Sequence, residues 1–296
     1  MADGGMTAYQ TIELRPLAGA IGAEIGGANL ARPLAPRQFA EIRRAFLEHL
    51  VIFFHDQHLT PEQHIEFTAR FGALSRMPYV KALDRHPDII AVLKEADEWQ
   101  ISVFGGAWHS DFSFLDEPPL GSVLYALDVP PYGGDTLWSS MYAAYDALSD
   151  GMKRLLDGRA ALHSGSVYGI DGLSAGLRTS RSIAISRNNP EADVERGHPV
   201  IRIHPETGRK ALFVNPIYTT RFEGMTKAES KPLLDFLYAH ATRPEFTCRF
   251  HWRKHALALW DNRCAMHYAI NDYDGQRRLM HRTTIAGDRP VGPARH

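Results

Sequence analysis

Residues 246–260 read FTCRFHWRKHALALW and contain two short segments, 246–252 and 256–260, in which bulky apolar side chains alternate with small or polar ones. A period of two residues places successive side chains on opposite faces, as in a β-strand with one face buried. We therefore expect one short strand in each segment.

The same short strand pattern recurs along the chain. It occupies residues 121–127, 200–203 and 210–215, and Thr207-Gly208 is typical of a hairpin turn between the last two. Helical patterns are few and separated, and lie at residues 39–48, 60–72, 141–148 and 226–240. Many short strands at near-regular spacing predict a mainly β fold with α insertions, in which a double-stranded β-helix (a jelly-roll, cupin-like core) is buttressed by helices.

The organisation of the chain favours one domain over residues 1–296, because no repeat, low-complexity tract or linker interrupts it. A doubly wound parallel sheet is the alternative fold. It requires strands and helices to alternate regularly, and they do not.

Charge and composition exclude several classes of partner. The 33 lysines and arginines nearly balance the 34 aspartates and glutamates, which argues against nucleic acid or an acidic membrane surface. The longest apolar runs, such as residues 50–54, are strand-sized, so no membrane span is expected. Two cysteines, Cys248 and Cys264, and no secretion signal favour unpaired thiols and a cytoplasmic location. The partner we expect is a small molecule.

Four places in the chain match His-x-Asp/Glu, a spacing that lets both side chains of a strand reach one metal ion. The pairs are His64 with Glu66, His86 with Asp88, His109 with Asp111, and His204 with Glu206. The first lies inside a predicted helix, and the second and fourth have a central proline in turn-like surroundings. Only His109 and Asp111 remain as candidate ligands, with a hydrogen-bonded pair at a strand end as the alternative.

A third ligand would have to come from elsewhere, because two histidines and one carboxylate on one face of an iron(II) octahedron leave positions for co-substrate and oxygen. His267 is a candidate, and His251, His255 and His281 are its rivals. Two arginines follow, Arg278 and Arg282, whose planar groups match carboxylates. They either bind anions near the metal or belong to an exposed charged run. A zinc half-site at Cys264 and His267 lacks the four ligands of a structural zinc.

Several segments together resemble the taurine dioxygenase and 2,4-dichlorophenoxyacetate dioxygenase (TauD/TfdA) family of iron(II)- and 2-oxoglutarate-dependent oxygenases. The resemblance rests on Trp108-His109-Ser110-Asp111, Gly133-Gly134-Asp135-Thr136, His204-Pro205, Trp260-Asp261-Asn262-Arg263, and His267 with Arg278 and Arg282. It runs nearly from end to end of the chain.

The resemblance implies a double-stranded β-helix with iron(II) on His109, Asp111 and His267, and O₂ and 2-oxoglutarate as co-substrates. It also implies that Thr136 and Arg278 bind the distal carboxylate of 2-oxoglutarate, and that Arg282 faces the anionic group of the substrate. Family members commonly form dimers or tetramers, so we expect a homo-oligomer. The presence of Asp111 favours hydroxylation over halogenation, and a hydroxyl placed beside an ether or sulfate oxygen would break the product apart.

Two positions depart from the taurine dioxygenase pattern. Met77 and Gly105 stand where that pattern has a substrate-binding histidine and asparagine. We therefore expect a roomier and more apolar pocket, with Met77, Tyr79, Val80 and Phe112 as its walls.

Segments near residues 223–226, 236–238 and 246–249 resemble the aryloxypropionate dioxygenases, so an aryloxyalkanoate acid is favoured over taurine. Alkyl sulfates and sulfonates are the alternative substrates. A metal-binding sensor of 2-oxoglutarate without catalytic activity, and a zinc hydrolase, are the alternative functions. Neither would need all of Thr136, Arg278 and the three metal ligands.

Overall fold

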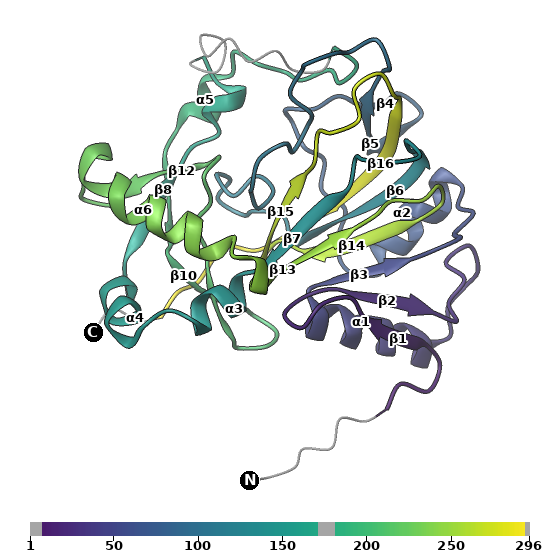
Figure 1. The fold of residues 1–296 in the computed structure, drawn as a ribbon, viewed down its shortest axis with the longest axis horizontal. Helices are drawn as coiled ribbons and strands as arrows, with labels where there is room; N and C mark the ends of the chain where they lie inside the picture. Colours follow the sequence, from purple (N-terminus) through teal and green to yellow (C-terminus); the bar gives the residue numbers. More distant parts are fainter. Residues whose placement is uncertain (1–7, 171–180, 294–296) are drawn as a thin grey trace.

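The computed structural model describes residues 8–170 and 181–293, which form a mainly β structure built around one large sheet (Figure 1). In spatial order the strands of this sheet are β1 (Glu13–Pro16), β2 (Ala23–Gly26), β3 (Val51–Phe54), β14 (Leu257–Asp261), β6 (Gly121–Asp128), β16 (Arg278–Ile285), β5 (His86–Lys94) and β4 (Ala82–Leu83). Within the described residues, the pairing of β2 with β3 is parallel and all other pairings are antiparallel. The prediction of a mainly β chain with α insertions is confirmed.

A smaller sheet contains β13 (Thr247–Phe250), β7 (Thr136–Ser140) and β15 (Ala265–Ala269). The two strands predicted at 246–252 and 256–260 are both present, as β13 and β14, but they belong to different sheets. β13 pairs with β7, whereas β14 lies between β3 and β6. The short link between them therefore carries the chain from the small sheet to the large one.

Alternation along β3 explains why every residue of this strand is buried. Val51 and Phe53 join the core on the side of the small sheet, and Ile52 and Phe54 join a second core on the opposite face. Phe53 stacks on Phe250 of the small sheet, with ring centroids 4.1 Å apart. The large sheet thus has apolar packing on both faces.

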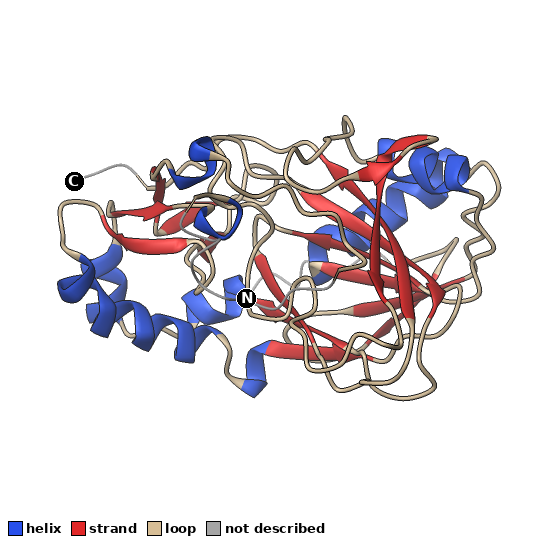
Figure 2. Cartoon of the chain, turned by 90° about the horizontal axis from the view of Figure 1, so that it is seen from above, coloured by secondary structure: helices blue, strands red, loops and turns tan. Residues whose placement is uncertain are grey.

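Helices cover the outer face of the large sheet. α1 (Pro36–His49) and α2 (Pro61–Ala69) contribute Ile42, Phe46 and Phe67 to the second core (Figure 2). α2 begins with a capping box, in which Thr60 and Gln63 bond reciprocally.

The remaining elements form a separate group on the other side of the small sheet (Figure 1). The helical segments are α3 (Met141–Asp146), α4 (Asp150–Leu156), η1 (Ser166–Tyr168), α5 (Pro190–Asp193), α6 (Lys227–Ala241) and η3 (Pro244–Phe246). The strands are β12 (Thr219–Phe222), β8 (Ala160–His163) and β9 (Arg196–Pro199) in one sheet, and β10 (Ile201–Ile203) with β11 (Lys210–Leu212) in another.

The hairpin predicted around Thr207-Gly208 is present, but it forms a two-stranded sheet of its own. Its second strand ends at Leu212 rather than near 215. Asn215 accepts hydrogen bonds from the backbone of Ile217 and Tyr218, and this local turn replaces strand pairing.

Removing the cap of α6 should weaken the fold modestly. Thr226 and Glu229 form a capping box, and the Thr226 hydroxyl accepts a hydrogen bond from the Glu229 backbone. We expect Thr226→Ala to lower the free energy of unfolding by about 1 kcal/mol, measured by urea denaturation. Thr242→Ala at the other end of the helix is the control, because the Thr242 hydroxyl bonds back to the Tyr238 and Ala239 carbonyls and caps no backbone N–H group. Equal losses in the two variants would contradict this prediction.

In the described part of the chain, no helix is both long enough and apolar enough to cross a bilayer.

Candidate active site

Two histidines far apart in the sequence are brought together by backbone pairing. His109 and His267 form an isolated antiparallel bridge, in which each backbone N–H donates to the carbonyl of the other, at 3.0 and 2.8 Å. His267 lies on β15, and its partner segment follows the loop 102–107. Such a close pair places both side chains on the same face of the ladder.

The ligand atoms of His109, Asp111 and His267 converge on one point. The Oδ1 atom of Asp111 lies 3.5 Å from Nε2 of His109 and 3.7 Å from Nε2 of His267, and all three atoms lie within 4.8 Å of one another. The other ring nitrogen of His109, Nδ1, lies 2.7 Å from the carbonyl of Ala107, which it can satisfy as an N–H donor. This leaves Nε2 of His109 as a lone-pair donor toward the centre of the triad.

The second oxygen of Asp111 is held by three side chains. Ser122 donates to Oδ2 at 3.1 Å, the Asn262 amide donates at 3.3 Å, and Nη2 of Arg282 lies 2.9 Å away. The Asn262 side chain also accepts from the Asp111 backbone and from the Trp260 indole. With Oδ2 occupied in this way, Oδ1 faces the two histidines as a single ligand atom.

Asn262 should therefore matter for metal affinity although it does not contact the metal. Loss of a side chain that orients a ligand typically lowers metal affinity by about 10- to 100-fold. We expect Asn262→Ala to weaken iron(II) binding within that range, measured by competition with a chelator. Asn29→Ala is the matched control, because Asn29 is exposed and bonds only locally. Unchanged affinity in Asn262→Ala would show that this amide does not orient Asp111.

Charge and burial keep Asp111 and His267 in their metal-binding protonation states. Burial raises the pKa of Asp111, but Arg282 and then the two histidines outweigh it and hold that pKa well below its usual range. Burial also keeps the pKa of His267 well below its ordinary value, so its imidazole is neutral at neutral pH. A carboxylate and a neutral imidazole are the forms that bind a divalent cation.

A small cavity next to the triad is lined by Thr136 and Arg278. Arg278 is 5% exposed, and in the described structure its Nε and Nη2 atoms have no hydrogen-bond partner. Burial lowers the pKa of this arginine. Unpaired guanidinium N–H groups facing a cavity beside a metal site fit a carboxylate such as the distal one of 2-oxoglutarate. The Thr136 hydroxyl accepts a hydrogen bond from the Trp252 indole, which fixes its position.

Arg282 lines the same small cavity and is 3% exposed. Its guanidinium contacts Asp111 and lies near the rings of Phe112 and Trp260. Within the described structure its Nε atom has no hydrogen-bond partner, and the cavity it lines also touches His109 and His267. That Arg282 faces the anionic group of the substrate stays a prediction.

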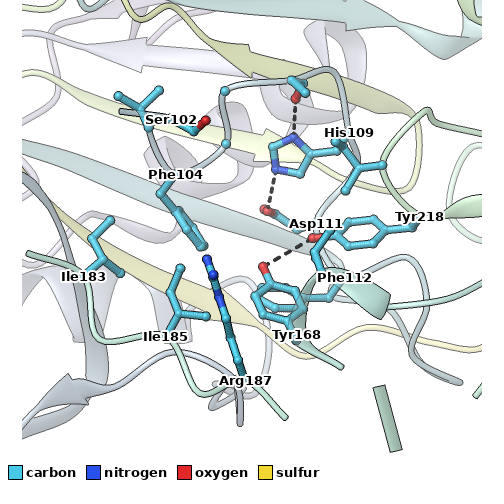
Figure 3. A pocket seen from close by; sticks show the side chains of 16 residues that line it. Ser102, Phe104, His109, Asp111, Phe112, Tyr168, Ile183, Ile185, Arg187 and Tyr218 are labelled. Carbon is cyan, nitrogen blue, oxygen red and sulfur yellow. Dashed lines mark hydrogen bonds and ion pairs between the residues drawn. The ribbon is translucent and has the colours of Figure 1, made fainter. Parts of the chain in front are cut away.

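A larger cavity of about 230 Å³ opens on the other side of His109 and Asp111 (Figure 3). Its apolar wall is formed by Phe104, Phe112, Val167, Ile183, Ile185 and Ile217. The hydroxyl groups of Tyr168 and Tyr218 lie 3.4 Å apart in the cavity, near Asp111 (Figure 3). Arg187 enters it beside Phe104 and Tyr168 (Figure 3).

Some of the predicted wall residues line the large cavity and others do not. Phe112 and Gly105 line the large cavity, whereas Met77, Tyr79 and Val80 lie behind its wall, in a core with Phe112. Tyr79 stacks on Tyr168 at 5.1 Å and is separated from the cavity by it. These three residues therefore support the wall rather than form it, and Ile183 and Ile185 line the cavity instead.

Gly105 adopts a φ of +80°, and a Cβ there would lie 3.3 Å from Cε1 of His109. A larger residue would be strained and would crowd this histidine. The backbone conformation at residue 105 therefore also favours glycine, which leaves room in the expected pocket.

The excluded and rival residues lie elsewhere. His64 is on α2, and the ring of His204 accepts hydrogen bonds from a turn and lies 3.0 Å from Asp261. His251 pairs with Asp135, and the ring of His255 contacts the Tyr125 hydroxyl. His86 begins a strand, β5, rather than lying in a turn, but its ring faces Glu62.

Sequence reasoning missed Ser122, Asn262, Tyr168, Tyr218 and Arg187. Only Asn262 carried a signal, as part of the quoted Trp260-Asp261-Asn262-Arg263 motif. The others reach the site from separate elements, and no spacing in the sequence connects them.

The site combines two histidines and one carboxylate with a cavity lined by arginines, on a mainly β framework. This combination is typical of the oxygenases that use iron(II) and a keto acid. The chain belongs to the TauD/TfdA family, because the family model described as taurine catabolism dioxygenase TauD, TfdA family matches residues 13–284. The predicted family is confirmed, and with it the enzyme class, an iron(II)- and 2-oxoglutarate-dependent dioxygenase.

Particular relatives extend this assignment. The chain is 35% identical to an alkylsulfatase of Acinetobacter baylyi, covering 96% of this chain and 87% of that protein. It is 34% identical to an alpha-ketoglutarate-dependent sulfate ester dioxygenase of Pseudomonas putida, covering 95% and 91%. The crystal structure of a taurine dioxygenase from Burkholderia xenovorans matches with a TM-score of 0.81 at 36% identity, covering 96% and 94%. Two of these three relatives are thus named for alkyl sulfate or sulfate ester substrates, and the third for taurine.

Proposed function

We propose that this enzyme oxidises an apolar sulfate ester at the carbon that carries the sulfate group. The observation that carries the proposal is the large cavity, which opens on His109 and Asp111 and combines an almost wholly apolar wall with one arginine. An alkyl chain would bury its surface against that wall, at roughly 25 cal/mol per Å² of apolar area. The two relatives named for sulfate esters support the same choice.

The proposed metal ligands are His109, Asp111 and His267, with Thr136 and Arg278 holding the distal carboxylate of 2-oxoglutarate. Bound iron(II) would supply the activation of O₂ that accompanies decarboxylation of 2-oxoglutarate to succinate. The residues of the chain fix the geometry: Asn262 and Ser122 orient Asp111, and Arg278 keeps the keto acid from swinging away.

The reaction balances as an oxygen insertion followed by fragmentation. One oxygen atom of O₂ enters the C–H bond beside the sulfate oxygen, and the other enters succinate. The hydroxylated carbon then loses sulfate by breaking the C–O bond, which leaves an aldehyde, sulfate and one proton.

We also propose that the chain is one domain, in which the large and small sheets form a double-stranded β-helix. We further propose that it forms a homo-oligomer, a dimer or tetramer. Light scattering after size exclusion measures the oligomeric state.

The test is a panel of linear alkyl sulfates, alkyl sulfonates and aryloxyalkanoates, assayed for succinate and for free sulfate or phenol. We expect alkyl sulfates to give equal amounts of succinate, sulfate and aldehyde. The second candidate substrate is an aryloxyalkanoate acid, whose ring the aromatic side chains of Phe104, Phe112 and Tyr168 favour. Turnover of aryloxyalkanoates alone would make this the substrate in place of the sulfate ester. No succinate with any member of the panel would reject both.

A further inference from the structure

We infer that Phe104 closes the small cavity on the side of the large one and thereby retains 2-oxoglutarate in its site. The inference rests on the proposed function in one respect, namely that 2-oxoglutarate lies in the small cavity with Thr136 and Arg278. It adds a residue that holds the co-substrate without binding the metal or a charged group.

The large and small cavities meet at few residues. Among the described residues, those that line both cavities are Phe104, Gly105 and His109. His109 is a proposed metal ligand and Gly105 has no side chain, so the side chain left to divide the two spaces is that of Phe104. Phe104 also lines a third, much smaller cavity, together with Val103 and Arg278. Its ring is therefore placed between the open cavity and the arginine.

The backbone is fixed on both sides of Phe104. The Asn271 side-chain amide donates to the carbonyl of Ile101 at 2.7 Å, and the backbone N–H of Ala269 donates to the carbonyl of Gly105 at 2.9 Å. Ala269 is the last residue of β15. The loop is thus tied to the end of this strand before and after Phe104, which holds the ring at the boundary between the two cavities.

Apolar packing holds the ring of Phe104 as well. The side chain is partly buried and packs against a core that includes Phe112, Tyr168 and Ile183. In Figure 3 the ring extends into the large cavity from its loop, near Ile185. It offers the neighbouring cavities an apolar surface and no polar group.

An apolar ring at this boundary has two effects on 2-oxoglutarate. It covers the methylene groups of the keto acid, and their burial favours binding. It also keeps the water of the large cavity away from Arg278, which is 5% exposed. A guanidinium in a dry cavity attracts a carboxylate more strongly, because its surroundings screen less. Loss of the ring should therefore weaken 2-oxoglutarate binding and leave the metal ligands unaltered.

The experiment titrates the iron(II) enzyme with 2-oxoglutarate, without oxygen and without any substrate, and follows the visible charge-transfer band. We expect Phe104→Ala to raise the dissociation constant of 2-oxoglutarate about tenfold, which corresponds to about 1.4 kcal/mol and to the burial of roughly two methylene groups. Phe104→Leu keeps most of the apolar bulk and should show a smaller loss. Iron(II) affinity, measured by competition with a chelator, should be unchanged in both variants.

Ile217→Ala is the matched control. Ile217 belongs to the apolar wall of the large cavity, and it is not among the described residues that line the small one. This substitution enlarges the large cavity without opening it toward Arg278. The variant should therefore bind 2-oxoglutarate as the wild type does.

Three results would overturn the role of Phe104. They are an unchanged 2-oxoglutarate affinity in Phe104→Ala, an equal loss in Ile217→Ala, and a loss of iron(II) affinity large enough to account for the whole effect. If Phe104→Ala does not fold, Phe104→Leu is compared with Ile217→Ala instead. A larger loss in Phe104→Leu supports the inference, and equal affinities reject it.

Arg278→Gln separates this inference from the proposed function. If neither Arg278→Gln nor Phe104→Ala weakens 2-oxoglutarate binding, the placement of the co-substrate in the small cavity is wrong, and the proposed function fails in that part. If Arg278→Gln weakens binding and Phe104→Ala does not, the placement stands and the role of Phe104 is rejected.

Discussion

Asp111→Ala is expected to lower iron(II) affinity and succinate formation by more than about a hundredfold. Removing a side chain that merely orients a metal ligand already lowers metal affinity by roughly 10- to 100-fold, and Asp111 is itself a ligand. It removes the only carboxylate of the triad and leaves the buried Arg282 without its counterion. The readout is the visible charge-transfer band that iron(II) and 2-oxoglutarate form without oxygen. We expect that band to disappear.

Two further variants make this result specific. Asp111→Asn keeps the shape and the hydrogen bonds around the side chain, so loss of the band in both variants points to the missing charge. Asp88→Ala removes the carboxylate of a rejected His-x-Asp pair, where Asp88 binds Arg76 at the surface. An undiminished band in Asp111→Ala, with the protein folded, would remove Asp111 from the metal site.

Arg278→Gln is expected to weaken 2-oxoglutarate binding by about a hundredfold or more. Two charged hydrogen bonds at roughly 1.5 to 3 kcal/mol each would be lost from a buried site. The measurement is a titration of the charge-transfer band with 2-oxoglutarate, and iron(II) affinity should change little.

The neighbouring arginine offers the control for this prediction. Arg277 is partly exposed and pairs with Glu95 and Asp128, away from both cavities. Arg277→Gln should titrate as the wild type does. Equal effects of the two substitutions would show that the charge of this segment, rather than a contact of Arg278, supports 2-oxoglutarate binding.

Local patterns predicted much of the secondary structure, because they depend on neighbours in the sequence. The helices predicted at 60–72 and 226–240, the Thr207-Gly208 turn and the strands at β6, β13 and β14 are all present. The pairing of strands was not predictable in the same way. β13 and β14 are close in sequence yet join different sheets, since each finds its partners through long-range packing.

In the candidate site, too, local spacing predicted some residues and tertiary structure decided the others. The His109-Ser110-Asp111 spacing could be selected from the sequence, because residues two apart on an extended segment share a face. His267 could not be separated from His251, His255 and His281 without the family resemblance. The structure separates them through the backbone bridge between His109 and His267, which no local pattern encodes.

The sequence by itself determined the class of the protein, the metal-ligand motif and the positions of most helices and strands, since these follow from residue type and short-range spacing. Only the tertiary structure decided which arginine faces which cavity. Arg278 and Arg282 both lie on β16 and turn toward the small cavity, whereas Arg187, from a segment with no motif, enters the large one. The direction of a side chain depends on the layers packed around its strand or loop, and those layers come from residues distant in the sequence.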